Sequence, residues 1–186
     1  MRRLVKARRR RLAALGPPYR QPVVKLRMSA SLGSLCAQES PVIPAGWSTS
    51  EVLSTPIEAS AQLLVDAYIG TTDWEDGDDE IVAAAELGKA VSGAYGEFLP
   101  AASLSLVDAE ARPVGQVVCC LEDGEPLILF MYTGRAHKGN GYAAFLIGEC
   151  AACLRAQGFE SVALYVTDGN PARRLYERLG FAEAAG

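Results

Sequence analysis

The first half of the chain contains two stretches in which apolar residues recur at the spacing of an amphipathic helix. Residues 55–58 read Thr-Pro-Ile-Glu, the order of an N-cap, a first-turn proline and an acid at the third helical position. We therefore expect a helix that starts here and ends near Gly70, where glycine permits a C-terminal cap. A second helix is expected over residues 79–92, and residues 47–53 have the composition of a first strand.

After these helices the apolar residues come in three short runs. The runs predict strands over residues 103–107, 114–121 and 126–133. Only short polar turns separate them, and this close spacing favours antiparallel pairing.

The last third of the chain changes period again. It predicts a helix over residues 141–157, a strand over 161–166 and a helix over 171–179. The strands on either side of the first of these helices should be parallel, with a right-handed crossover between them. The predicted fold class is therefore α/β of the mixed α+β kind. It has a central mixed sheet with antiparallel N-terminal strands, parallel strands around one helix, and helices on both faces.

Composition fits one folded domain without a membrane anchor. The chain has 186 residues, of which 49% are apolar, and no apolar run approaches the ~20 residues of a membrane span. The five cysteines and the lack of a secretory leader indicate reduced thiols and a cytoplasmic location. Cys150 and Cys153 form a C-x-x-C among alanines, where we expect packing rather than redox chemistry. His137 is the only histidine, so no Cys/His zinc set is available and no metal is expected.

Charge divides the chain into two parts. Residues 1–28 hold ten of the 18 basic residues and no acid, whereas residues 29–186 hold eight basic against 22 acidic residues. Residues 1–46 also contain several prolines, and we expect them to form a basic, disordered N-terminal extension before a domain over residues 47–186. The extension has three interpretations: a basic arm for anionic partners, an arginine-rich leader, or an over-extended reading frame with Met28 as the start. The acidic domain argues against a general nucleic-acid binder.

A glycine turn precedes the helix over residues 141–157 and has the features of a phosphate cradle. It reads Lys138-Gly-Asn-Gly-Tyr-Ala143, and its small residues let a ligand approach the backbone closely. The helix that follows offers unpaired N–H groups and a positive dipole end. The turn lacks the Gly-Lys-Ser/Thr of a Walker A loop and the G-x-G-x-x-G of a dinucleotide fold. Tyr176, on the last predicted helix, is placed to supply a proton donor.

These features resemble the GNAT superfamily of N-acetyltransferases. The family's acetyl-CoA loop reads [Gln/Arg]-x-x-Gly-x-[Gly/Ala] between a strand and a helix, and the turn at residues 138–143 fits this spacing with lysine in the first position. The ending Leu-Tyr-Glu-Arg-Leu-Gly-Phe over residues 175–181 and the order of elements from Trp47 onward also agree. The resemblance implies acetyl-CoA as co-substrate.

The resemblance also implies a role for each part of the site. The backbone where the sheet splays apart would pair with the pantetheine arm: Met131, Tyr132 and Thr133. Backbone amides of the loop would hold the pyrophosphate: Lys138, Gly139, Asn140, Gly141, Tyr142 and Ala143. Asn170 would contact the cofactor, although it lies six residues before Tyr176 where the family more often shows seven. Tyr176 would donate a proton to the departing CoA thiolate.

The acceptor side is less defined. No carboxylate lies within residues 126–133, and Glu125 stands at the edge of that strand. The acids after the first helix are candidates for a general base or for attracting a cationic amine: Asp73, Glu75, Asp76, Asp78, Asp79 and Glu80. The alternatives are a solvated acidic loop and a deprotonation relayed by water.

The function that follows is transfer of an acetyl group from acetyl-CoA to a primary amine of a small molecule or peptide, by direct attack in a ternary complex. The alternative is a non-catalytic CoA-binding or sensor module on the same fold. A nucleic-acid-associated modifier that uses the basic arm is a third hypothesis, against which the acidic domain argues. The family's final strand is missing or very short here, and the uncovered sheet edge favours a homodimer or pairing with residues 29–46.

Overall fold

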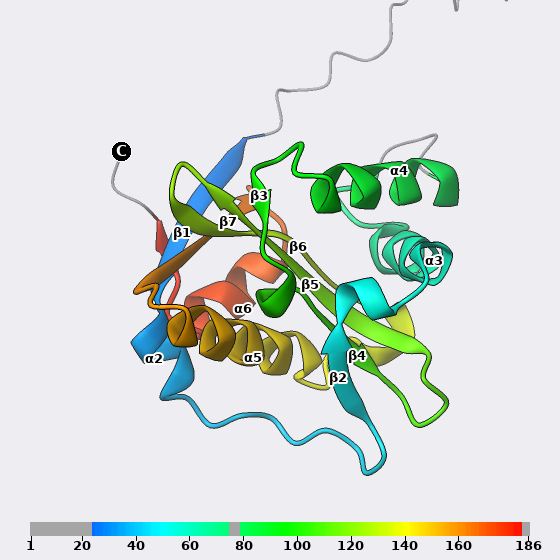
Figure 1. The fold of residues 1–186 in the computed structure, drawn as a ribbon, viewed down its shortest axis with the longest axis horizontal. Coiled ribbons are helices and arrows are strands. Elements are labelled where there is room, and N and C mark those ends of the chain that lie inside the picture. The colour runs from blue at the N-terminus through cyan, green and yellow to red at the C-terminus, as the bar shows by residue number, and fades with distance from the viewer. Residues whose placement is uncertain (1–23, 75–78, 184–186) are drawn as a thin grey trace, which may run out of the picture.

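The computed structural model describes residues 24–74 and 79–183, which form a mixed sheet with helices on both faces (Figure 1). The strands are β1 (Lys25–Ser31), β2 (Ser48–Glu51), β3 (Glu97–Phe98), β4 (Leu104–Val107), β5 (Pro113–Glu122), β6 (Glu125–Thr133), β7 (Ser161–Thr167) and β8 (Ala182–Glu183). The helices are α2 (Leu32–Cys36), α3 (Ile57–Tyr68), α4 (Glu80–Val91), α5 (Tyr142–Ala156) and α6 (Ala172–Arg178). The strand order is β2-β4-β5-β6-β7-β1-β8, and β3 pairs with β5.

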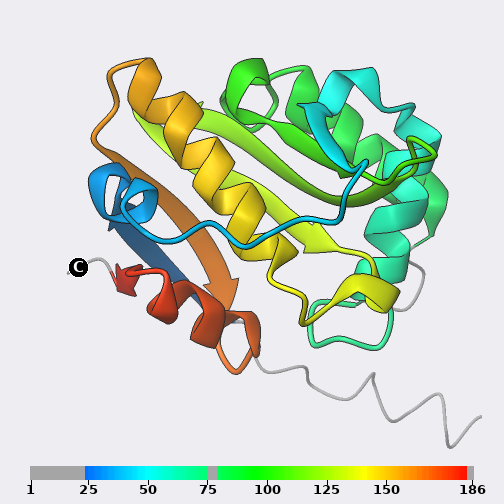
Figure 2. The same ribbon diagram turned by 90° about the horizontal axis from the view of Figure 1, so that it is seen from below.

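The sheet divides the core into two layers, and helices cover each of its faces. α5, α6 and α2 cover one face of the sheet, and α5 crosses it diagonally (Figure 2). α3 and α4 pack on the other face against β5 and β6, with Val118 and Tyr132 in the core between them. The predicted mixed α/β fold is therefore confirmed, and each predicted strand and helix after residue 46 is present within a few residues of its expected bounds.

Helix starts show where local sequence decided the structure and where it did not. Asp79 caps α4, because its Oδ1 accepts hydrogen bonds from the backbone N–H groups of Ile81 and Val82, each at 2.9 Å. The predicted cap at Thr55 is wrong. The residue immediately before α3 is Pro56 rather than Thr55. The Thr55 hydroxyl instead donates a hydrogen bond to Ser105 Oγ on β4, at 3.0 Å. A hydrogen bond to the sheet has thus replaced the expected cap of the helix.

β6 and β7 pair in parallel only at their beginnings. The paired residues are Leu127 with Ala163 and Ile128 with Leu164. The register between β5 and β6 shifts between Val118 and Cys119, which leaves Leu129 as the extra residue of a β-bulge. Because a bulge bends its strand, β6 leaves β7 at this point and the sheet opens toward the ends of both strands.

The prediction that residues 1–46 are disordered is wrong for residues 25–36. All seven residues of β1 pair antiparallel with β7, and α2 places Leu32 and Leu35 in the core. Met28 lies in the middle of β1 and is 1% exposed. The alternation of Leu26, Met28 and Ala30 toward the core supplies the physical reason, which the basic and proline-rich composition obscured. The domain therefore includes residues before 47, and residues 1–23 of the predicted extension lie outside the described part.

Two strands, β1 and β8, extend the sheet beyond β7 at the edge that the sequence left open. β8 is two residues long, as short as the sequence indicated, and it pairs with β1 at Met28 and Ser29. β1 in turn lies between β8 and β7, so pairing by the N-terminal segment is found, four residues earlier than expected. The homodimer stays a prediction. No helix among the described residues is long and apolar enough to cross a membrane.

Replacing Met28 by alanine should test the contribution of β1 to the fold. Loss of a buried methionine side chain is expected to lower the free energy of unfolding by about 2–5 kcal/mol, measured by urea denaturation. Val42→Ala is the control, because Val42 is 91% exposed and its change should stay within about 0.5 kcal/mol. Equal effects of the two substitutions would show that β1 adds nothing to stability.

Candidate functional site

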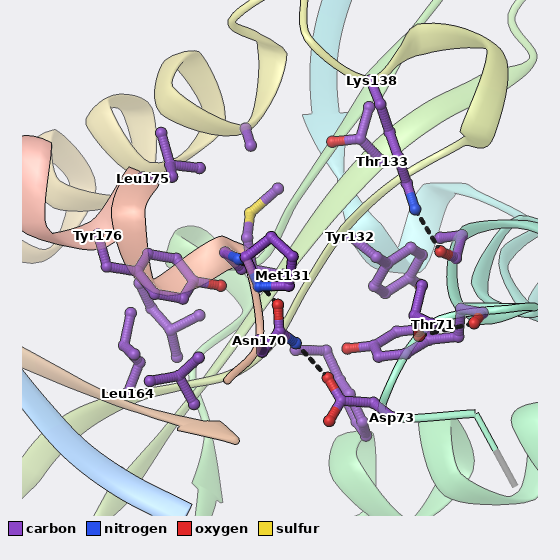
Figure 3. A pocket seen from close by; sticks show the side chains of 18 of the residues that line it. Thr71, Asp73, Met131, Tyr132, Thr133, Lys138, Leu164, Asn170, Leu175 and Tyr176 are labelled. Carbon is purple, nitrogen blue, oxygen red and sulfur yellow. Dashed lines mark hydrogen bonds between the residues drawn. The ribbon is translucent and has the colours of Figure 1, made fainter. Parts of the chain in front are cut away.

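One cavity of about 1740 Å³ passes through the opening between β6 and β7 (Figure 3). All but one of the residues predicted for the site line it: Met131, Tyr132, Thr133, Lys138, Gly139, Gly141, Tyr142, Ala143, Asn170 and Tyr176. Asn140 is the exception, since it is exposed and its Nδ2 donates to the carbonyl of His137 at 3.1 Å. The cavity continues to the other face of the sheet, where Leu64 and Tyr68 of α3 and Val82 of α4 form its wall.

The glycine turn presents backbone donors to this cavity. Gly139 and Gly141 have φ angles of 82° and 85°, a region that other residues rarely adopt. Gly141 precedes α5, and no side chain caps the helix. The first backbone bond of α5 runs from Phe145 to Gly141, so the N–H groups of residues 142–144 have no partner within the helix. These groups and the helix dipole favour an anion here.

A segment from the N-terminal part of the chain lies over the glycine turn. An added Cβ at Gly141 would come within 3.1 Å of Pro41 Cβ, so the two residues are in close contact. Trp47 packs against Tyr142 and against His137, with ring centroids 5.1 and 5.6 Å apart. The side chain of His137 therefore packs within this aromatic cluster.

Lys138 directs its ammonium group away from the turn. Its Nζ donates to the carbonyl of Ala67, near the end of α3, at 2.6 Å (Figure 3). The contribution of Lys138 to an anion site is thus confined to its backbone. Its side chain instead joins the loop to the helix on the opposite side of the cavity.

The open edge of β6 offers main-chain groups from alternate residues. Gly134 N–H donates to the carbonyl of Val114 at 2.9 Å, and Tyr132 lies opposite Gln116. In an antiparallel ladder this places the main-chain groups of Tyr132 toward β5 and those of Met131 and Thr133 toward the gap that β7 leaves. The Thr133 hydroxyl is also buried and has no hydrogen-bond partner among the described residues. Met131 and Thr133 are thus the residues that can pair with a ligand.

The side chain of Tyr132 belongs to a buried polar network. Its hydroxyl donates to Gln116 Oε1, and Gln116 Nε2 donates to Ser105 Oγ at 2.7 Å and Ser60 Oγ at 2.9 Å. Burial raises the pKa of Tyr132, so the phenol stays neutral. The network ties β6 to β5 and α3. Sequence analysis missed it, and its one signal was a glutamine within the apolar run of residues 114–121.

Asn170 connects the two sides of the cavity. Its Oδ1 accepts from the N–H of Ala172 at 2.8 Å, at the start of α6, and its Nδ2 donates to Asp73 Oδ2 (Figure 3). Both polar ends of the amide are therefore engaged. The side chain lines the cavity as predicted, but its bonds hold α6 to the loop after α3.

Tyr176 lies on α6 with its hydroxyl directed into the cavity, toward the side where Asn170 lies (Figure 3). The ring is 7% exposed and packs edge-on against Phe181 with centroids 5.8 Å apart. Burial raises the pKa of Tyr176 to about 12, and the charge of Asp73 adds to the rise. The phenol is therefore a neutral hydrogen-bond donor at physiological pH.

The structure distinguishes among the acidic residues that the sequence left as equal candidates on the acceptor side. Asp73 and Asp79 line the cavity, but Asp79 caps α4 and Glu80 is exposed. Glu125 forms an ion pair with Arg27 of β1 and does not line the cavity. Glu75, Asp76 and Asp78 lie outside the described residues. Asp73 is thus the candidate that bonds to Asn170, and its charge adds to the rise in the pKa of Tyr176.

Comparisons with known proteins agree with this geometry. The sequence model of the Acetyltransferase (GNAT) family matches residues 62–181. Among solved structures, a GCN5-related N-acetyltransferase from Sphaerobacter thermophilus is 20% identical with a TM-score of 0.64, and it is matched over 96% of this chain and 53% of its own. One from Kribbella flavida is 21% identical with a TM-score of 0.51, matched over 85% of this chain and 53% of its own.

A third solved structure is a NatC complex bound to Gag peptide and CoA. It is 15% identical with a TM-score of 0.53, matched over 75% of this chain and 86% of its own. At these levels of sequence identity, the structural matches show a shared fold. The chain spans about half the length of the two bacterial proteins. Among curated proteins, no sequence matches it.

Proposed function

The chain belongs to the acetyltransferase (GNAT) family, and from this premise we propose that it transfers an acetyl group from acetyl-CoA to a primary amine by direct attack in a ternary complex. One observation carries the proposal. A single cavity joins the glycine turn, the open edge of β6 and the hydroxyl of Tyr176, and it continues to the α3 and α4 side of the sheet.

The residues of the cavity fit acetyl-CoA. The free N–H groups at the start of α5 and the positive φ angles of Gly139 and Gly141 form a cradle for a pyrophosphate. The open main-chain groups of Met131 and Thr133 and the buried Thr133 hydroxyl offer hydrogen bonds to an amide-bearing arm. Acetyl-CoA would supply an acetyl group activated as a thioester. An N–H of the open edge is placed to polarise its carbonyl.

Direct attack is favoured over a covalent enzyme intermediate. None of the five cysteines is among the residues that line the cavity. Cys150 is buried against Cys119, whose contact together with burial raises the pKa of the Cys150 thiol. A buried, protonated thiol is a poor nucleophile. The five cysteines are free, which also supports the proposed cytoplasmic setting.

Tyr176 would act on the departing sulfur. A thiol has a pKa near ~8.5, below that of this phenol, so outright proton transfer from Tyr176 to a free thiolate is unfavourable. The hydroxyl instead keeps its proton and donates a hydrogen bond to the sulfur as negative charge develops there during cleavage of the C–S bond.

Calorimetric titration of the 186-residue protein with acetyl-CoA and with free CoA tests the proposal, followed by a thiol-release assay with primary amines. We expect micromolar binding of both and thiol release that depends on the amine. Binding without release by any amine would favour the non-catalytic CoA-binding module. No binding to folded protein would overturn the proposal.

A further inference from the structure

We propose that Asp73 forms a binding subsite for the ammonium group of the acceptor, so that the substrates are cationic primary amines. The inference rests on the proposed function, because it assigns a residue to the acceptor end of the same cavity. Asp73 lies in the loop after α3, half-buried, and its carboxylate is within hydrogen-bond reach of Asn170 in the cavity wall.

The charge of Asp73 is not neutralised by a cation of the described chain. No described lysine, arginine or histidine forms an ion pair with it. Two of the basic residues in the cavity wall are engaged elsewhere, since Lys138 donates to Ala67 and His137 packs on Trp47. The other two, Lys25 and Arg178, line the cavity without an ion pair to Asp73. A half-buried carboxylate without a cation attracts a ligand that brings a positive charge.

Asn170 fixes the direction in which the carboxylate faces. The Asn170 amide cannot turn over, because its Oδ1 already accepts from Ala172 N–H and only Nδ2 remains for Asp73. This bond uses Oδ2 of the carboxylate, and Oδ1 accepts from no described residue. Asn170 is therefore a positioning residue, and Asp73 Oδ1 is the atom available to an ammonium group.

Aromatic residues surround the same position. Trp74 follows Asp73 directly and lines the cavity. The phenols of Tyr68 and Tyr176 are close enough to feel its charge, which adds to the rise that burial causes in the pKa of each. Aromatic faces attract a cation in a partly desolvated site, and an amine held here would share the cavity with the hydroxyl of Tyr176. The subsite thus adjoins the point where the acetyl group would be transferred. Because an ammonium group has no lone pair, the bound nitrogen must pass a proton to water before it attacks the thioester.

Benzylamine and benzyl alcohol provide matched probes, since they share a ring and only the amine is charged at pH 7. Both would be titrated into the full-length protein, with and without saturating CoA. We expect wild-type protein to bind benzylamine at least tenfold more tightly than benzyl alcohol. Asp73→Asn should weaken benzylamine at least tenfold and leave benzyl alcohol unchanged.

Asp79→Asn is the matched control. It removes the same charge from the same cavity wall while asparagine keeps the cap of α4, so benzylamine affinity should change less than twofold. Equal benzylamine affinity in wild type and Asp73→Asn, or no benzylamine binding at all, would overturn the subsite. The CoA titration of the same samples reports separately on the proposed function. Wild-type protein that binds benzylamine through Asp73 but not CoA would retain the subsite and overturn the transferase.

Discussion

A glutamate in place of Gly141 is expected to abolish acetyl-CoA binding, with a loss of at least 100-fold in calorimetric titration. The glycine has a φ of 85°, and a Cβ here would come 3.1 Å from Pro41 Cβ. The new side chain must therefore displace either the Pro41 segment or the ligand. Its carboxylate would also lie beside the N–H groups that we assign to the pyrophosphate, where it repels the phosphates and competes for the same donors.

The control for this substitution lies in the helix that follows Gly141. Gly148 is in α5, and an added Cβ there meets nothing within 4 Å. Gly148→Glu therefore adds the same charge without steric conflict, and its CoA affinity should stay within twofold of wild type. Cooperative urea unfolding of both variants would exclude loss of fold as the cause. Tight CoA binding by folded Gly141→Glu would show that the cradle is assigned to the wrong place.

Removal of the Tyr176 hydroxyl should lower turnover about 100-fold or more while CoA affinity changes less than threefold. Phenylalanine keeps the ring and its edge-on contact with Phe181, so the packing of α6 should remain. The lost hydroxyl is the neutral donor that faces the cavity, and a donor aimed at developing negative charge typically contributes about 10²–10³-fold to a rate. Thiol release under single-turnover conditions measures the chemical step.

Tyr95→Phe is the comparison for Tyr176→Phe. Tyr95 donates to Glu86 and does not line the cavity, so its substitution removes one phenol hydroxyl outside the proposed site. Its turnover should match wild type. Unchanged turnover in Tyr176→Phe would remove this residue from the mechanism, whereas equal losses in both variants would indicate a general effect on the fold.

Much of the fold was predictable because local signals and the global structure agree. The period changes marked β4 to β7, α5 and α6, and Asp79 caps α4 as the sequence of its first turn suggests. β1 was missed for a physical reason. Its seven residues include two basic ones and follow an arginine-rich segment, and its principal pairing partner, β7, is far away in sequence.

The candidate site was predictable in its backbone parts and less so in its side chains. The glycine turn and Tyr176 depend on short sequence patterns. The bond between Asp73 and Asn170 joins residues 97 positions apart, and the bond between Gln116 and Ser60 joins residues 56 apart. No local pattern determines such contacts. They exist because the fold brings α3 against β5 and brings the loop after α3 against the loop before α6. Asn170 therefore contacts a carboxylate where the family pattern suggested a cofactor.

The place of β1 between β7 and β8 affects the order in which the protein can be assembled during synthesis. β1 leaves the ribosome before all the other described strands, yet its two pairing partners begin at Ser161 and Ala182 and are made long after it. Until then Met28 and its neighbours have no sheet to pair with, and closing so long a loop is slow. A nascent chain would therefore carry β1 unpaired until β7 has been made, which makes this segment the expected binding site for a chaperone.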